Sequence, residues 1–306
     1  MASQPTDLPV VTITGPTASG KTGLAVEVAQ AIDAEIISVD SALVYRGLDI
    51  GAAKPDMEER QGVPHHLIDI REPAEPYSAA DFRDDAIRLV EEIRARGKRV
   101  VMAGGTMLYL KALKDGIAEM PPANQELRYE IALEAQEKGW PFIHQELAKV
   151  DSVAAERINP NDPQRLQRAL EVYRVSGKTL TEWQQQETKG CPFELKELAI
   201  MPNDRAALHQ RIEVRFGQML DAGFQAEVER LHARGDLHAG LPSIKSVGYR
   251  QMWSHLEGDY DFETMTYKAV VATRQLAKRQ YTWLRSWQNL DILHNPSLAE
   301  ALKNLG

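Results

Sequence analysis

The sequence predicts an α/β fold in which helices flank a parallel β-sheet and an all-helical subdomain is inserted. The first observation behind this prediction is that strand and helix patterns alternate over residues 1–115. The second is a glycine motif at residues 15–22, which follows a strand pattern directly and opens a helix. The third is that strand patterns are missing from residues 121–190 and return after them. Together they predict a P-loop NTPase-like parallel sheet with a helical insertion.

The first part of the chain supplies four predicted strands. They are the apolar, β-branched runs at residues 9–14, 35–39, 66–70 and 99–103. One helix is predicted over residues 21–32. Another begins at Ser78, where Asp81 completes a capping box, and ends at Gly97. Because strands that alternate with helices pair in parallel, ligands are expected beyond the carboxyl ends of these strands.

The rest of the chain divides into two parts. Three helices are predicted at residues 124–138, 143–150 and 162–176. Residues 121–190 are therefore expected to form the inserted subdomain, and residues 1–120 and 191–306 to form the core. The returning core is predicted to contain a strand at 195–201, helices at 204–222 and 261–287, and a last strand at 290–293.

Composition and charge limit the class of protein. The 306 residues carry a formal net charge of −8, which argues against a general coating of basic charge for nucleic acid. The single cysteine, Cys191, excludes an internal disulfide and a Cys-rich zinc site. No apolar run approaches the ~18 residues of a membrane helix, and residues 1–10 lack the basic region of a signal peptide. We therefore expect a cytoplasmic protein with no membrane partner.

The glycine motif, GPTASGKT, matches G-x-x-x-x-G-K-[ST]. In such a loop, backbone N–H groups and the helix N-terminus converge on phosphate oxygens. Lys21 adds a cation, and the Thr22 hydroxyl is placed to bind Mg²⁺. The motif predicts binding of a di- or triphosphate, for which ATP or GTP is the commonest case. The expected diphosphate-binding residues of the loop are Gly15, Thr17, Ala18, Ser19, Gly20, Lys21 and Thr22.

A carboxylate, Asp40, follows the second predicted strand. Because parallel neighbours end at the same edge of a sheet, Asp40 is expected beside the phosphate loop. It is suited to hold Mg²⁺ or to accept a proton from the group that attacks the phosphorylated substrate. Asp69 is a second candidate for the metal, and equally a turn residue at the end of a strand. This chemistry leaves a small-molecule kinase open.

Seven stretches of the chain carry a wider resemblance. They are GPTASGKT, DSALVYRGLDIGAAKP, HHLID, AGGTMLYLKAL, NDPQRLQRALEVY, LPSIKSVGYRQM and TRQLAKRQYTWLR. In this order they resemble the tRNA dimethylallyltransferase (tRNA isopentenyltransferase) family over nearly the whole chain. Eukaryotic relatives add a C-terminal zinc finger, whereas this chain holds one cysteine. The resemblance is therefore to the bacterial form.

The resemblance implies transfer of a dimethylallyl group from dimethylallyl diphosphate to tRNA. The acceptor is the exocyclic amine of the adenosine immediately 3′ of the anticodon, in tRNAs that read codons beginning with U. Lys21, the loop amides and Mg²⁺ at Thr22 would stabilise the departing diphosphate. Asp40 matches the family's base, and Thr106 matches a position at the reacting centre. An arginine of the helix at 204–222 is expected to reach the diphosphate, and the candidates are Arg211 and Arg215.

The resemblance also implies contacts with the anticodon stem-loop of tRNA. The expected contact residues are Asp40, Ser41, Ala42, Leu43, Thr106, Arg128, Gln164, Arg165, Leu166, Gln167, Arg168, Lys245, Ser246, Val247, Gly248, Tyr249, Arg250, Lys278, Arg279 and Arg285. Residues 264–290 contain five basic residues and no acid, with aromatic side chains between them, which suits phosphate contact and base stacking. The alternative for this stretch is a helix that buries its aromatics and exposes its cations.

The sequence therefore predicts a monomeric, Mg²⁺-dependent enzyme that binds tRNA and dimethylallyl diphosphate. A first alternative is a P-loop kinase that uses ATP to phosphorylate a small molecule or nucleoside, with Asp40 as base to a hydroxyl. A second is a tRNA-binding protein that uses a nucleotide only as a switch.

Overall fold

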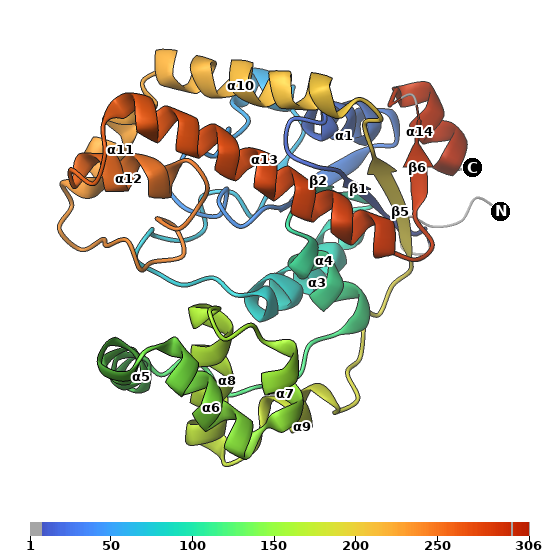
Figure 1. The fold of residues 1–306 in the computed structure, drawn as a ribbon. Coiled ribbons are helices and arrows are strands. Elements are labelled where there is room, and N and C mark those ends of the chain that lie inside the picture. Colours follow the sequence, from blue (N-terminus) through green and yellow to red (C-terminus); the bar gives the residue numbers. More distant parts are fainter. Residues whose placement is uncertain (1–7, 295, 306) are drawn as a thin grey trace. The chain divides into compact units, whose positions relative to one another are not determined.

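The computed structural model describes residues 8–294 and 296–305, and within these ranges six parallel strands form one sheet (Figure 1). The strand order is β3-β2-β4-β1-β5-β6. Their bounds are Val10–Thr14 (β1), Ala34–Val39 (β2), His65–His66 (β3), Arg99–Gly104 (β4), Leu195–Ile200 (β5) and Asp291–Leu293 (β6). The predicted parallel α/β sheet is confirmed. Residues 1–7 of the predicted leaderless N-terminus lie outside the described ranges.

Helices cover the sheet and extend beyond it. Their bounds are Lys21–Ala31 (α1), Met57–Arg60 (α2), Ala79–Ala95 (α3), Met107–Asp115 (α4), Arg205–Asp221 (α10), Phe224–His232 (α11), Tyr249–Leu256 (α12), Phe262–Ser286 (α13) and Leu298–Leu305 (α14). The predicted capping box of α3 is present, since Ser78 and Asp81 bond to each other's backbone N–H. In the part of the chain that the structure describes, no helix combines the length and the apolar character that crossing a bilayer requires.

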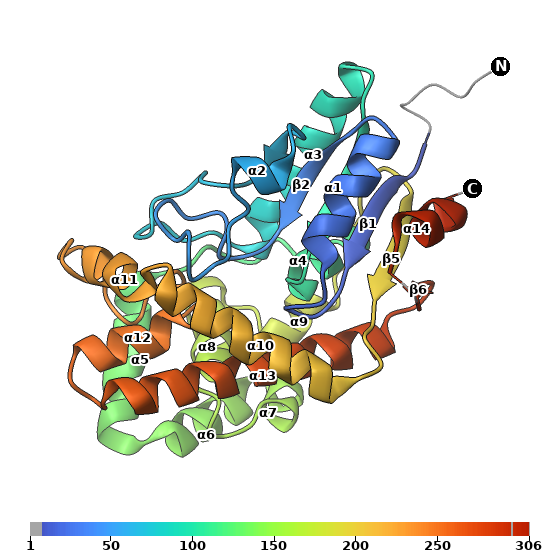
Figure 2. The same ribbon diagram turned by 90° about the horizontal axis from the view of Figure 1, so that it is seen from above.

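The register of the central strands brings three strand ends together. Thr14 of β1 and Val39 of β2 both lie opposite Gly104 of β4. Gly15 and Asp40, which follow directly, therefore emerge at the same edge of the sheet. Figure 2 shows α10 and α13 beyond this edge, where the strands point. The sheet thus places the phosphate loop next to the Asp40 loop.

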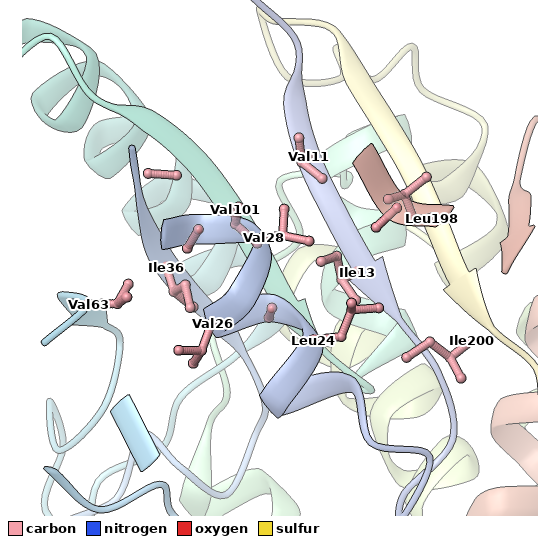
Figure 3. Close-up of a cluster of buried hydrophobic side chains, with 14 of the residues drawn as sticks. Val11, Ile13, Leu24, Val26, Val28, Ile36, Val63, Val101, Leu198 and Ile200 are labelled. Carbon is pink, nitrogen blue, oxygen red and sulfur yellow. The ribbon is translucent and has the colours of Figure 1, made fainter. Parts of the chain in front are cut away.

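A buried apolar cluster fixes α1 on one face of the sheet (Figure 3). Leu24 and Val28 of α1 pack with Ile13 of β1 and Val101 of β4. Because side chains alternate along a strand, Met102 points to the opposite face, where α3 contacts β2 and β4. The loop that joins β1 to α1 is therefore held between two elements whose positions the core determines.

The third strand is shorter than predicted. Pairing ends at His66, whereas the prediction extended to residue 70. Leu67 and Asp69 have φ of +61° and +57°, in the left-handed region that a strand cannot pass through. The prediction of a strand over residues 67–70 is therefore wrong, and the apolar alternation there belongs to a turn.

Residues Asp115–Gly190 form a compact helical unit, and the rest of the chain forms the other unit. The helices of this unit are Gln125–Lys138 (α5), Trp140–Val150 (α6), Ser152–Arg157 (α7), Pro163–Ser176 (α8) and Leu180–Gln184 (α9). Its core includes Ile131, Leu147 and Leu170. Gly139, with φ of +85°, separates α5 from α6. The three predicted helices are confirmed, whereas the short α7 and α9 were not predicted.

Candidate active site

The loop between β1 and α1 leaves the N-terminal end of the helix open. Gly20 precedes α1 with φ of +87°, and no side chain caps this end. Lys21 Nζ folds back over the loop and donates to the carbonyl oxygen of Pro16 at 3.3 Å. Gly15 has no room for a side chain, because a Cβ would lie 2.7 Å from Ser19 Oγ. Uncapped N–H groups with a lysine beside them form a binding site for an anion.

Lys21, Asp40 and Arg215 line one small cavity of about 90 Å³. Burial lowers the pKa of Lys21 to about 8, the Asp40 carboxylate partly opposes this shift, and Arg215 adds to it. Burial also lowers the pKa of Arg215, again opposed by Asp40. Two desolvated cations facing a single carboxylate favour a ligand that brings further negative charge.

Both candidate arginines of α10 reach the phosphate loop, in different ways. Arg211 Nε donates to the carbonyl oxygen of Ala18 at 3.1 Å and is exposed. Arg215, one turn further along the helix, is half-buried and lines the small cavity. Of the two candidates, Arg215 therefore lines the small cavity with Lys21, whereas Arg211 contacts the backbone of the phosphate loop.

A hydrogen bond between Ser41 and Thr106 joins the loops that follow β2 and β4, next to Asp40. Asp40 Oδ1 accepts the N–H of Ala42 at 2.8 Å, which holds the carboxylate in a tight turn. Thr106 Oγ1 accepts the N–H of Ser41 at 3.1 Å. Gly104 permits this approach, because a Cβ there would lie 2.1 Å from the carbonyl oxygen of Val39. Asp40, Ser41 and Thr106 thus form one side of the site.

The residues at the small cavity suit Mg²⁺ bound together with a phosphate. The buried Oγ of Ser38 has no hydrogen-bond partner among the described residues and lines this cavity with Thr22. Within the described ranges, no three His, Cys, Asp or Glu side chains are grouped to hold a metal alone. Mg²⁺ at a phosphate site takes most of its ligands from phosphate and water. A single ligand from Thr22, with Ser38 bonded to a water, fits that pattern.

A larger cavity of about 450 Å³ adjoins the small one. The two share Thr17, Asp40 and Arg215 in their linings. The apolar part of the larger cavity is formed by Met107, Leu108, Ile212, Phe216, Met219, Leu276 and Trp283. Its volume is typical of a cavity that binds a small organic molecule. We call the small cavity the anion pocket and the larger cavity the apolar chamber. Asp40 lines both of them.

A buried carboxylate that the sequence did not reveal holds one wall of both cavities. Glu227 of α11 accepts the N–H groups of Asp49, Ile50 and Gly51 at 2.7–3.1 Å and the hydroxyl of Tyr249 at 2.6 Å. Burial raises the pKa of Tyr249, and Glu227 raises it further, so its hydroxyl remains a donor. We call residues 49–53 the wall loop. A single acid in an amphipathic helix gives no sequence signal for a contact with a loop 178 residues earlier.

Asp69, the second metal candidate, is an ion-pair partner in the same region. Lys54 Nζ lies 2.5 Å from Asp69 Oδ1 and 2.6 Å from Asp49 Oδ1. The lysine is buried, and it also donates to the carbonyl oxygen of Tyr45. Asp69 is outside both cavity linings. These contacts support the turn alternative for Asp69, which pairs with Lys54 in the turn that follows β3.

The tRNA-contact residues predicted in the helical unit differ in their surroundings. Arg128 and Arg168 both bind the buried carboxylate of Glu171, at 2.9 Å each. Arg165 is the most open of the three arginines, with 73% of its side chain exposed. Leu166 is fully buried in the core of the unit, so its side chain cannot be a contact in this conformation. Gln164 is exposed, and Gln167 donates to the backbone of Arg128.

Most of the predicted contact residues of the core unit lie around the larger cavity. Its lining includes Ser41, Ala42, Thr106, Lys245, Ser246, Val247, Gly248 and Arg279. Lys278, Arg279 and Arg285 are exposed on α13, and Arg250 is exposed on α12. Tyr249 also belongs to this lining, and its buried hydroxyl bonds to Glu227 and to the N–H of Ala52 in the wall loop.

Comparisons with known proteins agree on one class. A family model described as IPP transferase matches residues 43–287. A full-length tRNA isopentenylpyrophosphate transferase from Bacillus halodurans is 34% identical, covers 97% of this chain and 96% of its own, and superposes with a TM-score of 0.70. The tRNA delta(2)-isopentenylpyrophosphate transferase from Staphylococcus epidermidis is 34% identical, with coverages of 98% and 97% and a TM-score of 0.69. A eukaryotic dimethylallyltransferase acting on tRNA is 28% identical, with coverages of 91% and 70% and a TM-score of 0.72.

Proposed function

The chain belongs to the IPP transferase family and is a prenyltransferase that acts on tRNA, and from this premise we propose how its residues perform the reaction. A dimethylallyl group passes from dimethylallyl diphosphate to the exocyclic amine of the adenosine immediately 3′ of the anticodon, in tRNAs that read codons beginning with U. The observation that carries the proposal is the convergence of Lys21, Arg215 and Asp40 between an anion pocket and an apolar chamber.

The donor occupies both cavities. Its diphosphate lies in the small cavity, against Lys21, Arg215 and the N-terminus of α1, and its dimethylallyl group lies in the apolar chamber. Thr22 would hold Mg²⁺ together with the phosphate, and the ion would supply additional positive charge to the leaving group. Ser19, whose buried Oγ is unpartnered within the described residues, supplies a further donor. The cations act on the charge that develops as diphosphate departs, which is where electrostatic stabilisation has its largest effect.

Asp40 assists the acceptor. The bond between C1 of the donor and the diphosphate oxygen breaks, and a bond forms between C1 and the exocyclic nitrogen of adenine. The proton on that nitrogen passes to the Asp40 carboxylate. The turn that binds Asp40 Oδ1 to Ala42 fixes the carboxylate before the substrate arrives. Thr106, which holds the same turn through Ser41, keeps the base in place.

The acceptor adenosine must leave the stack of the anticodon loop to reach Asp40. The chamber is lined by Lys245, Ser246 and Arg279, whose polar atoms suit phosphate and sugar contacts at its mouth. Trp283 in the same lining offers a surface on which a base can stack. These residues support RNA entry through the larger cavity.

We propose that the enzyme acts as a monomer. A tRNA substrate supports a cytoplasmic location. The family and the three related structures give no support to the kinase alternative.

The function is tested by incubating the protein with dimethylallyl diphosphate, Mg²⁺ and unmodified tRNA, followed by nucleoside analysis. We expect N6-isopentenyladenosine together with released diphosphate. ATP turnover with no modified nucleoside would support the kinase instead. Absence of both products, with tRNA affinity that depends on bound nucleotide, would support the nucleotide switch.

Affinity for diphosphate is expected to fall as the pH rises above 8. The pKa of Lys21 is about 8 in the free site, so the lysine is charged below this pH and loses its charge above it. Binding of an anion at higher pH must then include uptake of a proton, which weakens the apparent affinity by up to about tenfold per pH unit. Calorimetry with inorganic diphosphate and Mg²⁺ from pH 7 to 9.5 measures this. Lys21→Arg, which stays charged, should flatten the profile, and an unchanged slope would contradict the assignment to Lys21.

Arg165→Ala is expected to weaken tRNA binding and leave the affinity for dimethylallyl diphosphate unchanged. The side chain is 73% exposed, so its removal leaves no buried charge unpaired. Loss of one phosphate contact should also lower the slope of log affinity against log salt by about one. The matched control is Arg157→Ala, an exposed arginine of the same unit outside the predicted contact set. Loss of affinity for dimethylallyl diphosphate in Arg165→Ala would instead show that α8 contributes to the donor site.

A further inference from the structure

Gln280 of α13 joins two loops of the active site through its carboxamide. Its Oε1 accepts the N–H of Thr17 in the phosphate loop at 2.9 Å. Its Nε2 donates to the carbonyl oxygen of Gly105, directly before Thr106, also at 2.9 Å. The side chain is only 7% exposed, although Lys278 and Arg279 beside it are exposed. Gln280 is therefore turned into the protein from a helix whose neighbouring cations face outward.

The site requires an amide of this length. One bond needs an acceptor and the other needs a donor, and a carboxamide supplies both from one planar group. Gly105 is matched to it, because a Cβ at this position would lie 2.4 Å from Gln280 Nε2. Both bonds go to backbone atoms, so Gln280 fixes the course of the two loops and not the conformation of their side chains.

The contacts form a continuous connection between the two reacting groups. Gln280 links the phosphate loop to Gly105, and the adjacent Thr106 binds the N–H of Ser41 next to Asp40. The helix itself is anchored by Tyr281, whose hydroxyl donates to the carbonyl oxygen of Pro202 after β5. The loop that would hold the diphosphate is thus connected through Gln280 to the Gly105–Thr106 segment, and through Thr106 to the loop that carries the base.

We propose that Gln280 is a positioning residue that sets the distance between the diphosphate loop and the Asp40–Thr106 side of the site, an inference that rests on the proposed function. Its loss lets the two loops move independently. Each loop still binds its own ligand, but the donor carbon and the acceptor nitrogen are no longer held in line. A displacement of about 1 Å between reacting groups costs about 10²-fold in rate.

The first test replaces Gln280 by alanine and, separately, by glutamate. A glutamate can accept the N–H of Thr17, but its second oxygen cannot donate to the carbonyl oxygen of Gly105. It therefore cannot restore both bonds. We expect both variants to lower kcat by about 10²-fold, with dissociation constants for inorganic diphosphate and tRNA within about threefold of wild type. Gln275→Ala, an exposed glutamine on the same helix, should keep its kcat. Unchanged kcat in Gln280→Ala, or a loss confined to donor affinity, would overturn the inference.

The second test uses the close approach of Gly105. Gly105→Ala drives a methyl group into Gln280 and should lower kcat at least as far as Gln280→Ala. In the double variant the obstructing amide is gone, so the second substitution should cost less than it does alone. Independent, multiplicative losses would contradict direct contact between these residues.

Hydrogen exchange separates failure of this inference from failure of the proposed function. The amide of Thr17 should exchange faster in Gln280→Ala than in wild type, whatever the protein catalyses. An unchanged rate at Thr17 would refute the positioning role. Wild-type protein that fails to modify tRNA would refute the proposed function and leave the exchange result standing.

Discussion

Asp40→Ala is expected to lower turnover by ~10²–10⁴-fold and to leave tRNA affinity nearly intact. Asp40 lines both cavities, and its carboxylate is the acidic side chain shared by the two linings. The exocyclic amine of adenine is a poor nucleophile, because its lone pair is delocalised into the ring. In the alanine variant no carboxylate accepts the proton of the amine. The reaction then depends only on the electrostatic stabilisation of the leaving diphosphate. Single-turnover rates and tRNA binding measured on the same preparation report the two quantities.

Asn at position 40 provides the matched control. An asparagine oxygen still accepts the N–H of Ala42, so Asp40→Asn keeps the turn and removes only the basic carboxylate. We expect it to be as slow as Asp40→Ala. Wild-type turnover in either variant would remove Asp40 from the role of base. A rate for Asp40→Asn close to wild type, with a slow alanine variant, would assign the residue to holding the loop.

Glu227→Ala is expected to lower the free energy of unfolding by about 3–5 kcal/mol, because four donors lose their acceptor and each unsatisfied buried donor costs about 1–3 kcal/mol. Three backbone N–H groups and the hydroxyl of Tyr249 lose their acceptor at once. The three N–H groups belong to the wall loop, which lines both cavities, so the affinity for dimethylallyl diphosphate should fall as well. Urea denaturation followed by circular dichroism measures the stability, and calorimetry with diphosphate measures the affinity.

Glu227→Gln keeps the size of the side chain and removes its negative charge, so it tests whether the charge is needed. Both oxygens of Glu227 accept hydrogen bonds. In either rotamer of a glutamine side chain, the NH₂ group would replace one of these acceptors and would face donors. We expect Glu227→Gln to be destabilised too, whereas Glu229→Ala, an exposed acid on the same helix, should stay within about 0.5 kcal/mol of wild type. Tyr249→Phe, which removes one of the four donors, should cost about 1.5–3 kcal/mol. A glutamine variant as stable as wild type would show that the carboxylate is not required.

Local signals in the chain predicted most of the elements at the sheet edge. The β-branched run before Gly15, the helix after Gly20 and the capping box at Ser78 depend on neighbouring residues, and the structure confirms each of them. The third strand was predicted too long because left-handed residues at Leu67 and Asp69 leave no mark on the alternation of apolar side chains. Asp69 pairs with the buried Lys54, and the order of apolar and polar residues along the chain does not indicate this ion pair.

The roles of single residues in the predicted contact sets depended on packing. Leu166 and Arg165 are adjacent in one motif, yet the first is buried in the helical core and the second is open to solvent. Arg211 and Arg215 share a helix face, and only the arrangement of α10 against the phosphate loop distinguishes them. A motif gives the residue types that a site needs, whereas burial and direction follow from the elements that surround each side chain.

By itself, the sequence determined the phosphate loop, the carboxylate at the end of the second strand and the parallel order of strands and helices, because each follows from short-range geometry. Only the tertiary structure decided that Arg215 lines the small cavity beside Lys21, that Glu227 holds the wall loop and that Gln280 joins the loops of the site. These contacts connect residues 175–263 positions apart. Such pairs meet only after the sheet and its helices have packed, so no local pattern records them.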